Sequence, residues 1–235
     1  MKAVTCTRYG PPEVLELREL EKPVPNDREV RIRIFATSVT ASDCIIRGAK
    51  IPVWHPMGLM VRLAIGFTKP RQPIPGIVFA GEVDSLGSNA TAFASGERVF
   101  GWDLFPAFGA YAEYKCMRDD GMLAVMPSNV NFQEAAAIPF GGLLALHFLR
   151  KAKLSKSHKV LVYGASGAIG TSAVQLARHF GAEVTGVCST ANVELVKSLG
   201  AAAVIDYTRE DFTNGPARYD VVLNAVGKRK ANPQP

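Results

Sequence analysis

The alternation of apolar and polar positions changes character about halfway along the chain. The first part consists of short runs with β-branched or alternating side chains, separated by turn signals such as Gly10-Pro11-Pro12 and Pro25-Asn26-Asp27. These runs predict strands at residues 2–7, 15–20, 29–39, 76–86, 98–102 and 110–116. Strands with this spacing are typical of a small barrel or sandwich.

The second part alternates strands with helices. Residues 131–150 have helical periodicity, and Asn131 with Glu134 three residues later forms a candidate capping pair. The pattern then predicts a strand at 159–163, a helix at 168–180, a strand at 183–188, a helix at 192–199, and strands at 203–205 and 220–224. This order predicts βαβ units and a parallel sheet. We place the boundary at Met126-Pro127, so the predicted domains are residues 1–126 and 127–235.

Composition and charge narrow the class of protein. The chain has 235 residues, 48% of them apolar and 20% charged, as in ordinary globular proteins. Its 27 basic and 21 acidic residues are spread along the sequence, and Lys228-Arg229-Lys230 is the one compact basic run. Because a nucleic-acid binder usually concentrates its charge, we do not expect nucleic acid to be the main partner.

The cysteines and the apolar segments exclude further classes. The four cysteines are scattered without a Cys-x-x-Cys pair, so we expect neither a disulfide framework nor a zinc lobe. The start of the chain has no apolar signal core, and the least polar stretch, 51–67, is interrupted by prolines, His55 and Arg62. We therefore expect no membrane span and a cytoplasmic location.

A glycine-rich turn follows the predicted strand at 159–163 and opens the next helix. It reads Gly164-Ala165-Ser166-Gly167-Ala168-Ile169-Gly170. In a dinucleotide-binding turn the first glycine permits the sharp turn, the second lets a pyrophosphate approach the backbone, and the third lets helix and strand pack closely. The N–H groups at the helix start would then hold the phosphates, so all seven residues are predicted to bind a nicotinamide dinucleotide.

A hydrolase is the main alternative, because a nucleophile elbow also joins a strand to a helix. Gly164-x-Ser166-x-Ala168 comes close to that motif, which requires an acid and then a histidine later in the chain. The last histidine, His179, lies in the helix directly after Ser166, so no base follows an acid. We therefore interpret Ser166 as a turn residue.

The end of the second strand of this part indicates which dinucleotide binds. An NAD site normally has Asp or Glu there, whereas this chain has Gly186-Val187-Cys188-Ser189-Thr190. Ser189 and Thr190 can donate hydrogen bonds to a 2′-phosphate, which favours NADP(H). The same two residues can also be the N-cap of the next helix, and the two interpretations are compatible.

Several motifs together resemble one family. They are Met1-Lys-Ala-Val4, Tyr9-Gly-Pro-Pro-Glu-Val-Leu15, Val39-Thr-Ala-Ser-Asp43-Cys-Ile-Ile-Arg47-Gly48, Pro75-Gly-Ile-Val-Phe-Ala-Gly-Glu-Val83, Gly96-Glu-Arg-Val-Phe-Gly101, Gly109-Ala-Tyr-Ala-Glu-Tyr114, Glu134-Ala-Ala-Ala-Ile-Pro139, the glycine turn and Val204-Ile-Asp-Tyr207. The chain resembles the zinc-free, quinone oxidoreductase-like group of the medium-chain dehydrogenase/reductase superfamily.

The resemblance implies an α/β protein: an N-terminal chaperonin-10-like β-barrel domain followed by a Rossmann doubly wound parallel sheet, with substrate and nicotinamide between them. The positions that match the catalytic zinc ligands of the superfamily's alcohol dehydrogenases are Thr40, Ile77 and Pro139, which cannot bind a metal. The implied reaction is hydride transfer from NADPH to a quinone or an α,β-unsaturated carbonyl.

The resemblance also assigns site residues. Thr40 and Asp43 match the turn that faces the nicotinamide, and Tyr207 matches a tyrosine that contacts the cofactor. An equally open interpretation is that Asp43 caps a turn and pairs with Arg47. Residues 53–67 match a variable region that helps to cover the substrate pocket, although core packing explains their apolar side chains equally well.

The sequence departs from the family pattern in two ways. Ile45 and Leu144 stand where relatives often have Tyr and usually Thr, and the turn Thr190-Ala191-Asn192-Val193 lacks a basic residue found in many relatives. A complete dinucleotide fold has about six parallel strands, whereas four are predicted from Lys159 onward.

The shorter sheet has three consequences for the expected function. We expect a Rossmann domain that is truncated after its fourth strand and has an exposed sheet edge, which invites aggregation or pairing. The resemblance implies a homodimer for full-length relatives, an expectation that we do not extend to this chain. The alternative function is a non-catalytic truncated relative that binds dinucleotide or a protein partner without turnover.

Overall fold

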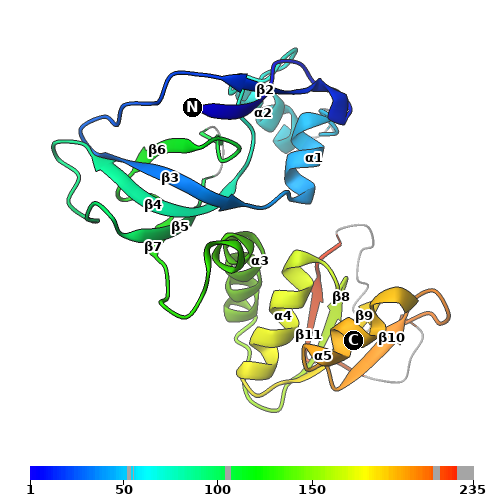
Figure 1. Cartoon of the computed structure of the whole chain (residues 1–235). Coiled ribbons are helices and arrows are strands. Elements are labelled where there is room, and N and C mark those ends of the chain that lie inside the picture. The colour runs from blue at the N-terminus through cyan, green and yellow to red at the C-terminus, as the bar shows by residue number, and fades with distance from the viewer. Residues whose placement is uncertain (52–53, 55, 104–106, 214–217, 227–235) are drawn as a thin grey trace. The chain divides into compact units, whose positions relative to one another are not determined.

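The chain folds into two units, Met1–Pro139 and Phe140–Pro235. The computed structural model describes residues 1–51, 54, 56–103, 107–213 and 218–226 (Figure 1). Residues 53 and 55 of the predicted pocket-covering region, and the basic run at 228–230, lie outside the described residues.

The first unit contains two antiparallel sheets. Strands β1 (Lys2–Cys6) and β2 (Leu15–Glu19) form one of them. The other has the order β6-β3-β4-β5-β7 and consists of β3 (Glu29–Thr37), β4 (Val78–Leu86), β5 (Arg98–Trp102), β6 (Tyr114–Arg118) and β7 (Leu123–Val125). Alternate residues such as Val30 and Ile32 on β3 are fully buried against Phe79, Val83 and Val99. The predicted alternation therefore places one face of β3 in the core.

The strand predicted at 110–116 was wrong in position. Strand β6 begins at Tyr114, where pairing with β3 starts at Arg33. Before that point the N–H groups of Ala110 and Tyr111 donate to the carbonyl oxygens of Gly76 and Pro75, and Val4 N–H of β1 donates to the Tyr111 carbonyl oxygen, so this segment pairs with a loop and with β1.

The first unit also contains helices that the alternation of apolar residues did not predict. These are α1 (Ala41–Arg47), α2 (Pro56–Ile65) and the short 3₁₀ turn Pro12–Val14. Helix α1 begins with a capping box, in which Thr40 and Asp43 satisfy each other's backbone N–H groups. Helix α2 begins at a proline, whose fixed φ suits the first helical position.

Helix α3 (Phe132–Lys151) contributes side chains to the cores of both units. The predicted capping pair is confirmed, because Glu134 N–H donates to Asn131 Oδ1 at 2.8 Å and Asn131 N–H donates to Glu134 Oε2 at 2.9 Å. Ala135 and Ala136 pack with Ala80 and Met126 in the first unit, whereas Ala145 and Leu149 lie in the core of the second. Among the described helices only α3 has the length and apolar composition of a membrane span, which by itself is weak evidence for one. The domain limits 1–126 and 127–235 stay a prediction.

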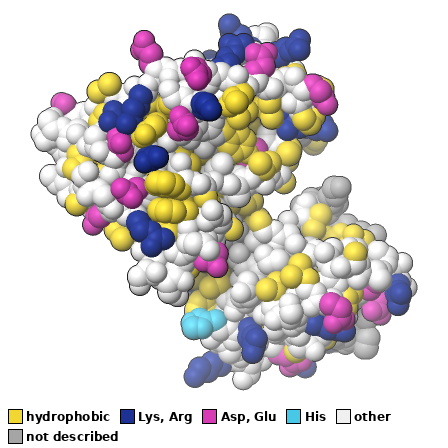
Figure 2. Space-filling view, viewed as in Figure 1, with side chains coloured by type: hydrophobic (Ala, Val, Ile, Leu, Met, Phe, Trp, Pro, Cys, Tyr) yellow, Lys and Arg dark blue, Asp and Glu magenta, His cyan; other side chains and the backbone are white. Residues whose placement is uncertain are grey.

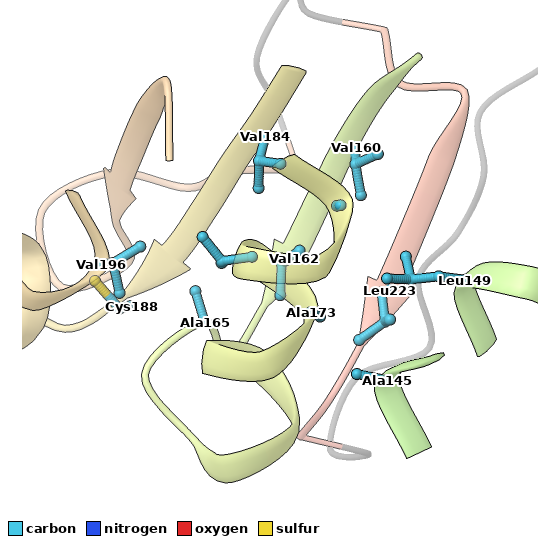
Figure 3. Packing of buried hydrophobic residues seen from close by; sticks show 12 residues of the cluster. Ala145, Leu149, Val160, Val162, Ala165, Ala173, Val184, Cys188, Val196 and Leu223 are labelled. Carbon is cyan, nitrogen blue, oxygen red and sulfur yellow. The ribbon is translucent and has the colours of Figure 1, made fainter. Parts of the chain in front are cut away.

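The second unit is a parallel sheet with crossover helices. It consists of β8 (Lys159–Tyr163), α4 (Ala168–His179), β9 (Glu183–Cys188), the 3₁₀ turn Thr190–Asn192, α5 (Val193–Ser198), β10 (Ala203–Asp206) and β11 (Val221–Asn224). The sheet order β10-β9-β8-β11 is that of the first four strands of a Rossmann fold, and it confirms the predicted fold class. Val160, Val162, Val184 and Leu223 from three of the strands meet Ala173 of α4 and Leu149 of α3 in its core (Figure 3).

Candidate functional site

The glycine turn between β8 and α4 is held by its backbone. Gly164 has φ +83°, a conformation that side chains disfavour, and it makes the sharp turn at the end of β8. The N–H groups of Gly164 and Ala165 both donate to the Val187 carbonyl oxygen at 3.0 Å, which ties the turn to β9. The predicted role of the first glycine agrees with this geometry.

Gly170 allows α4 to pack directly on the turn. A Cβ atom at this position would lie 2.1 Å from the Gly164 carbonyl oxygen and 2.7 Å from Ala165 Cα, distances that no side chain tolerates. Gly141 of α3, which sequence reasoning did not single out, has a similar role, because its Cβ would lie 2.2 Å from the Ala168 carbonyl oxygen. Gly141 therefore lets α3 approach the first residue of α4.

Gly167 differs from these glycines. Its φ of −81° is open to any residue, and the nearest atom to an added Cβ would be the Gly164 carbonyl oxygen at 3.5 Å. Gly167 and Ala168 are exposed, and no side chain caps the start of α4. The first N–H groups of a helix have no partner within it, and the helix dipole favours an anion there. The turn thus fits a dinucleotide diphosphate: the backbone conformation requires glycine at 164, packing requires it at 170, and an exposed surface without a side chain remains at 167.

The other predicted cofactor residues lie at the carboxyl ends of β9 and β10. Parallel pairing places Asp206 opposite Cys188, and Tyr207 N–H donates to the Cys188 carbonyl oxygen at 3.1 Å. Ser189 and Thr190 follow the end of β9 directly, and Tyr207 follows the end of β10 directly. The Tyr207 side chain is half exposed. The structure therefore brings the ends of these two strands together, at the edge where ligands bind in open α/β sheets.

The capping interpretation of Ser189 and Thr190 is only partly met. Ser189 is the N-cap residue of the 3₁₀ turn, but its side chain makes no capping hydrogen bond and instead accepts one from Asn192 Nδ2 at 3.0 Å. The Thr190 hydroxyl donates to Asp206 Oδ2 at 2.5 Å and lies 2.8 Å from the Thr208 hydroxyl. Asp206 is thus a site residue that sequence reasoning missed.

The segment after β10 borders a groove in the second unit. The groove has a volume of about 490 Å³ and is lined by Tyr163 and by residues 207–212. Phe212 stacks on Tyr163, with ring centroids 4.7 Å apart, which holds this segment against the end of β8.

Thr40 and Asp43 form a tight pair at the start of α1. The Thr40 N–H and hydroxyl donate to Asp43 Oδ2 at 2.8 and 2.7 Å, and Asp43 N–H donates to Thr40 Oγ1. The capping interpretation of Asp43 is therefore confirmed. Its predicted pairing with Arg47 was wrong, because the carboxylate faces the helix start while Arg47 Nε donates to the Gly10 carbonyl oxygen.

Asp43 is buried and has two further neighbours of interest. It borders a cavity of about 30 Å³, the volume of roughly one water molecule, which Arg47 and Phe108 also line. The Tyr111 hydroxyl is buried, and its burial and then the charge of Asp43 raise the pKa of Tyr111.

The positions that match zinc ligands in alcohol dehydrogenases have other roles here. Thr40 caps α1, Ile77 is 1% exposed in the core, and Pro139 is a buried residue of α3. Within the described part of the chain, no group of three or more His, Cys, Asp or Glu side chains could hold a metal ion.

Two family models match the chain. The alcohol dehydrogenase GroES-like domain matches residues 26–128, and the domain described as zinc-binding dehydrogenase matches residues 168–234. The fold and the glycine turn therefore define the chain as a dehydrogenase/reductase built from a GroES-like and a dinucleotide-binding domain.

Curated relatives and solved structures narrow that class. The chain is 36% identical to 2-methylene-furan-3-one reductase of Solanum lycopersicum and 31% identical to an alkenal/one oxidoreductase of Arabidopsis thaliana named as NADPH-dependent and chloroplastic; each match covers 97% of this chain and 58% of the relative. It is 30% identical to the quinone oxidoreductase of Pongo abelii over 99% of this chain and 68% of that protein.

The solved structure of a quinone oxidoreductase from Coxiella burnetii superposes with a TM-score of 0.84 at 30% identity, covering 97% of this chain and 69% of that one. The Escherichia coli quinone oxidoreductase complexed with NADPH superposes with a TM-score of 0.77 at 27% identity, covering 91% and 60%. This chain belongs to the quinone oxidoreductase-like group of the medium-chain dehydrogenase/reductase superfamily. It spans 58% of the length of the first two relatives.

Proposed function

We propose that the protein is an NADPH-dependent, zinc-independent oxidoreductase that reduces quinones or α,β-unsaturated carbonyls by hydride transfer. The observation that carries the proposal is the glycine turn, which is closely packed at Gly164 and Gly170 and exposed to solvent, without a close contact, at Gly167. The printed names of the relatives, among them quinone oxidoreductases and an NADPH-dependent alkenal/one oxidoreductase, support the reaction class.

NADPH, when bound, supplies the hydride; the chain's own residues hold and orient it. The start of α4 would bind the diphosphate, with residues 164–170 as its cradle. Ser189, Thr190 and Tyr207, at the ends of β9 and β10, would surround the 2′-phosphate of the adenosine half.

Thr40 and Asp43 are proposed to act near the substrate. Since the Thr40 hydroxyl hydrogen is donated to Asp43, the carboxylate fixes the orientation of Thr40. Because that hydrogen is already donated and a carboxylate only accepts, the pair offers no donor to the substrate's carbonyl oxygen in this arrangement. In this proposal Thr40 and Asp43 shape the wall of the substrate site that faces the nicotinamide.

The direct test is turnover by the purified chain. NADPH oxidation should be seen as a fall in absorbance at the nicotinamide band on adding 1,2-naphthoquinone or a short enone, and a chelator should leave the rate unchanged. Alcohol oxidation that a chelator abolishes would contradict the proposal.

A non-catalytic relative is the second candidate. Leu144 and Ile45, which stand where relatives carry hydroxyl-bearing residues, favour it because they offer no hydrogen bond to cofactor or substrate. Thermal stabilisation by NADPH without turnover of any quinone or enone would support this alternative. Cytoplasmic location, and the absence of nucleic-acid and membrane partners, stay predictions.

A further inference from the structure

The sheet places an acidic side chain where the sequence of β9 has none. Asp206 is the last residue of β10, and parallel pairing sets it opposite Cys188, the last residue of β9. An acid at the end of β9 is what an NAD site normally uses to bind the ribose hydroxyls. Here the neighbouring strand delivers one to the same edge, next to Thr190.

Asp206 engages two hydroxyl groups that would otherwise be available to a phosphate. Thr190 Oγ1 donates to Asp206 Oδ2 at 2.5 Å, and Thr208 Oγ1 donates to Asp206 Oδ1 at 2.7 Å. Each hydroxyl has one hydrogen, so neither Thr190 nor Thr208 can donate to a 2′-phosphate while it donates to the carboxylate.

The charge on Asp206 is held in place by its surroundings. The hydrogen bond from Thr190 lowers the pKa of Asp206, and those from Thr208 and the charge of Arg209 act in the same direction. Its side chain is 12% exposed, whereas that of Arg209, whose Nε lies 3.6 Å from Asp206 Oδ2, is 76% exposed. A largely buried anion therefore stands beside a solvent-exposed cation.

We propose that Asp206 is a specificity-determining residue that limits the preference of this protein for NADPH over NADH. Its carboxylate competes with the 2′-phosphate for the Thr190 hydroxyl and repels the phosphate, whereas it can accept a hydrogen bond from the free ribose hydroxyl of NADH. Arg209 opposes this effect by offsetting the carboxylate charge. The inference rests on the proposed function, since it concerns the adenosine end of the same cofactor site.

A purely structural role for Asp206 predicts a different result. Asp206 also shapes the turn after β10, because Oδ1 accepts from Thr208 N–H at 3.0 Å. Asn has the same shape and keeps an oxygen for that bond, so Asp206→Asn removes the charge and retains the turn. If the role is structural, the affinities for both dinucleotides change by the same factor and their ratio stays constant. If Asp206 sets specificity, the two affinities change by different factors and their ratio shifts.

The experiment is a titration of the whole chain with NADPH and with NADH, from which the ratio Kd(NADH)/Kd(NADPH) is taken. Asp206→Asn should raise this ratio about tenfold, since a nearby like charge is lost, and Arg209→Gln should lower it. Glu210→Gln is the matched control: it removes one negative charge from the same segment, and it should change the ratio less than about twofold.

An unchanged or lower ratio in Asp206→Asn would overturn the inference. Where that variant does not fold, Arg209→Gln decides: a lower ratio supports the inference and an unchanged ratio overturns it. Wild-type protein that binds neither dinucleotide would refute the proposed function itself. Binding with turnover but no shift in ratio would refute only the role of Asp206.

Discussion

Individual glycines in the turn after β8 have different physical tasks. Gly164 is needed for its positive φ and Gly170 for its close contact, so both are requirements of the fold. Gly167 meets neither requirement, because its φ of −81° is ordinary and an added Cβ atom would make only an ordinary van der Waals contact, 3.5 Å from the Gly164 carbonyl oxygen. A glycine that neither backbone conformation nor packing requires points to a bound ligand. Substitutions within this motif should therefore affect stability at Gly164 and Gly170, and cofactor binding at Gly167.

Gly170→Ala should destabilise the protein by about 1–3 kcal/mol, because the methyl group overlaps the Gly164 carbonyl oxygen and the helix must shift. Gly167→Ala is the control and should change the free energy of unfolding by less than about 0.5 kcal/mol. Chemical denaturation followed by circular dichroism measures both. Equal effects of the two variants would contradict the packing interpretation.

Tyr111 should show the effect of its surroundings in its titration. Burial and the charge of Asp43 raise its pKa, so the folded state keeps the phenol protonated at a pH where the unfolded chain, with a pKa near 10, loses the proton. This contribution to stability is fully present below pH ~10 and is lost as the pH rises towards the folded-state value.

Phenolate absorbance during a rise in pH measures this titration. In the wild type Tyr111 should ionise after the exposed tyrosines or on unfolding, and Tyr111→Phe should remove its part of this late titration and leave that of Tyr9, whose pKa burial also raises. Ionisation of all tyrosines below pH ~10 in the folded protein would show that Tyr111 is not shielded.

For individual helices and strands, how well the sequence predicts an element depends on what stabilises that element. Strands β8 and β9 are almost continuously buried, and their predicted limits match the structure; the edge strand β10 is only partly buried, and its predicted limits are one residue short. Helix α1 has no long periodic pattern, and its signal was the capping box of Thr40 and Asp43. Strand β7 has three residues, too few for a pattern to show.

The capping pair of α3 gives a test at this scale. Asn131→Ala should lower the free energy of unfolding by about 1 kcal/mol, because the Glu134 N–H loses its acceptor at the helix start. Gln133→Ala is an exposed change in the same turn and should stay within about 0.5 kcal/mol of wild type. A loss in the control as large as in Asn131→Ala would contradict the role of the cap.

At the level of the whole molecule, the chain consists of two units with different kinds of sheet. Side chains of both charges are interspersed over the face shown in Figure 2. The class of fold could be predicted from sequence because the switch from alternating strands to strand–helix units is long and regular. The sequence predicts only those candidate site residues that lie close together in the chain, as in the glycine turn. Asp206 was missed because strand register, and not sequence spacing, brings it to Thr190.

The central claim is that the glycine turn binds the diphosphate of a nicotinamide dinucleotide at Gly167. Isothermal titration of the purified chain with NADPH, comparing wild type with Gly167→Val, tests it most directly. A Cβ atom at this position would make only an ordinary contact with the Gly164 carbonyl oxygen, so the variant should stay folded, with an unfolding temperature only slightly below that of wild type. It should nevertheless bind NADPH at least about tenfold more weakly, because the side chain stands where the phosphates approach. Wild-type affinity in the folded variant would contradict the account.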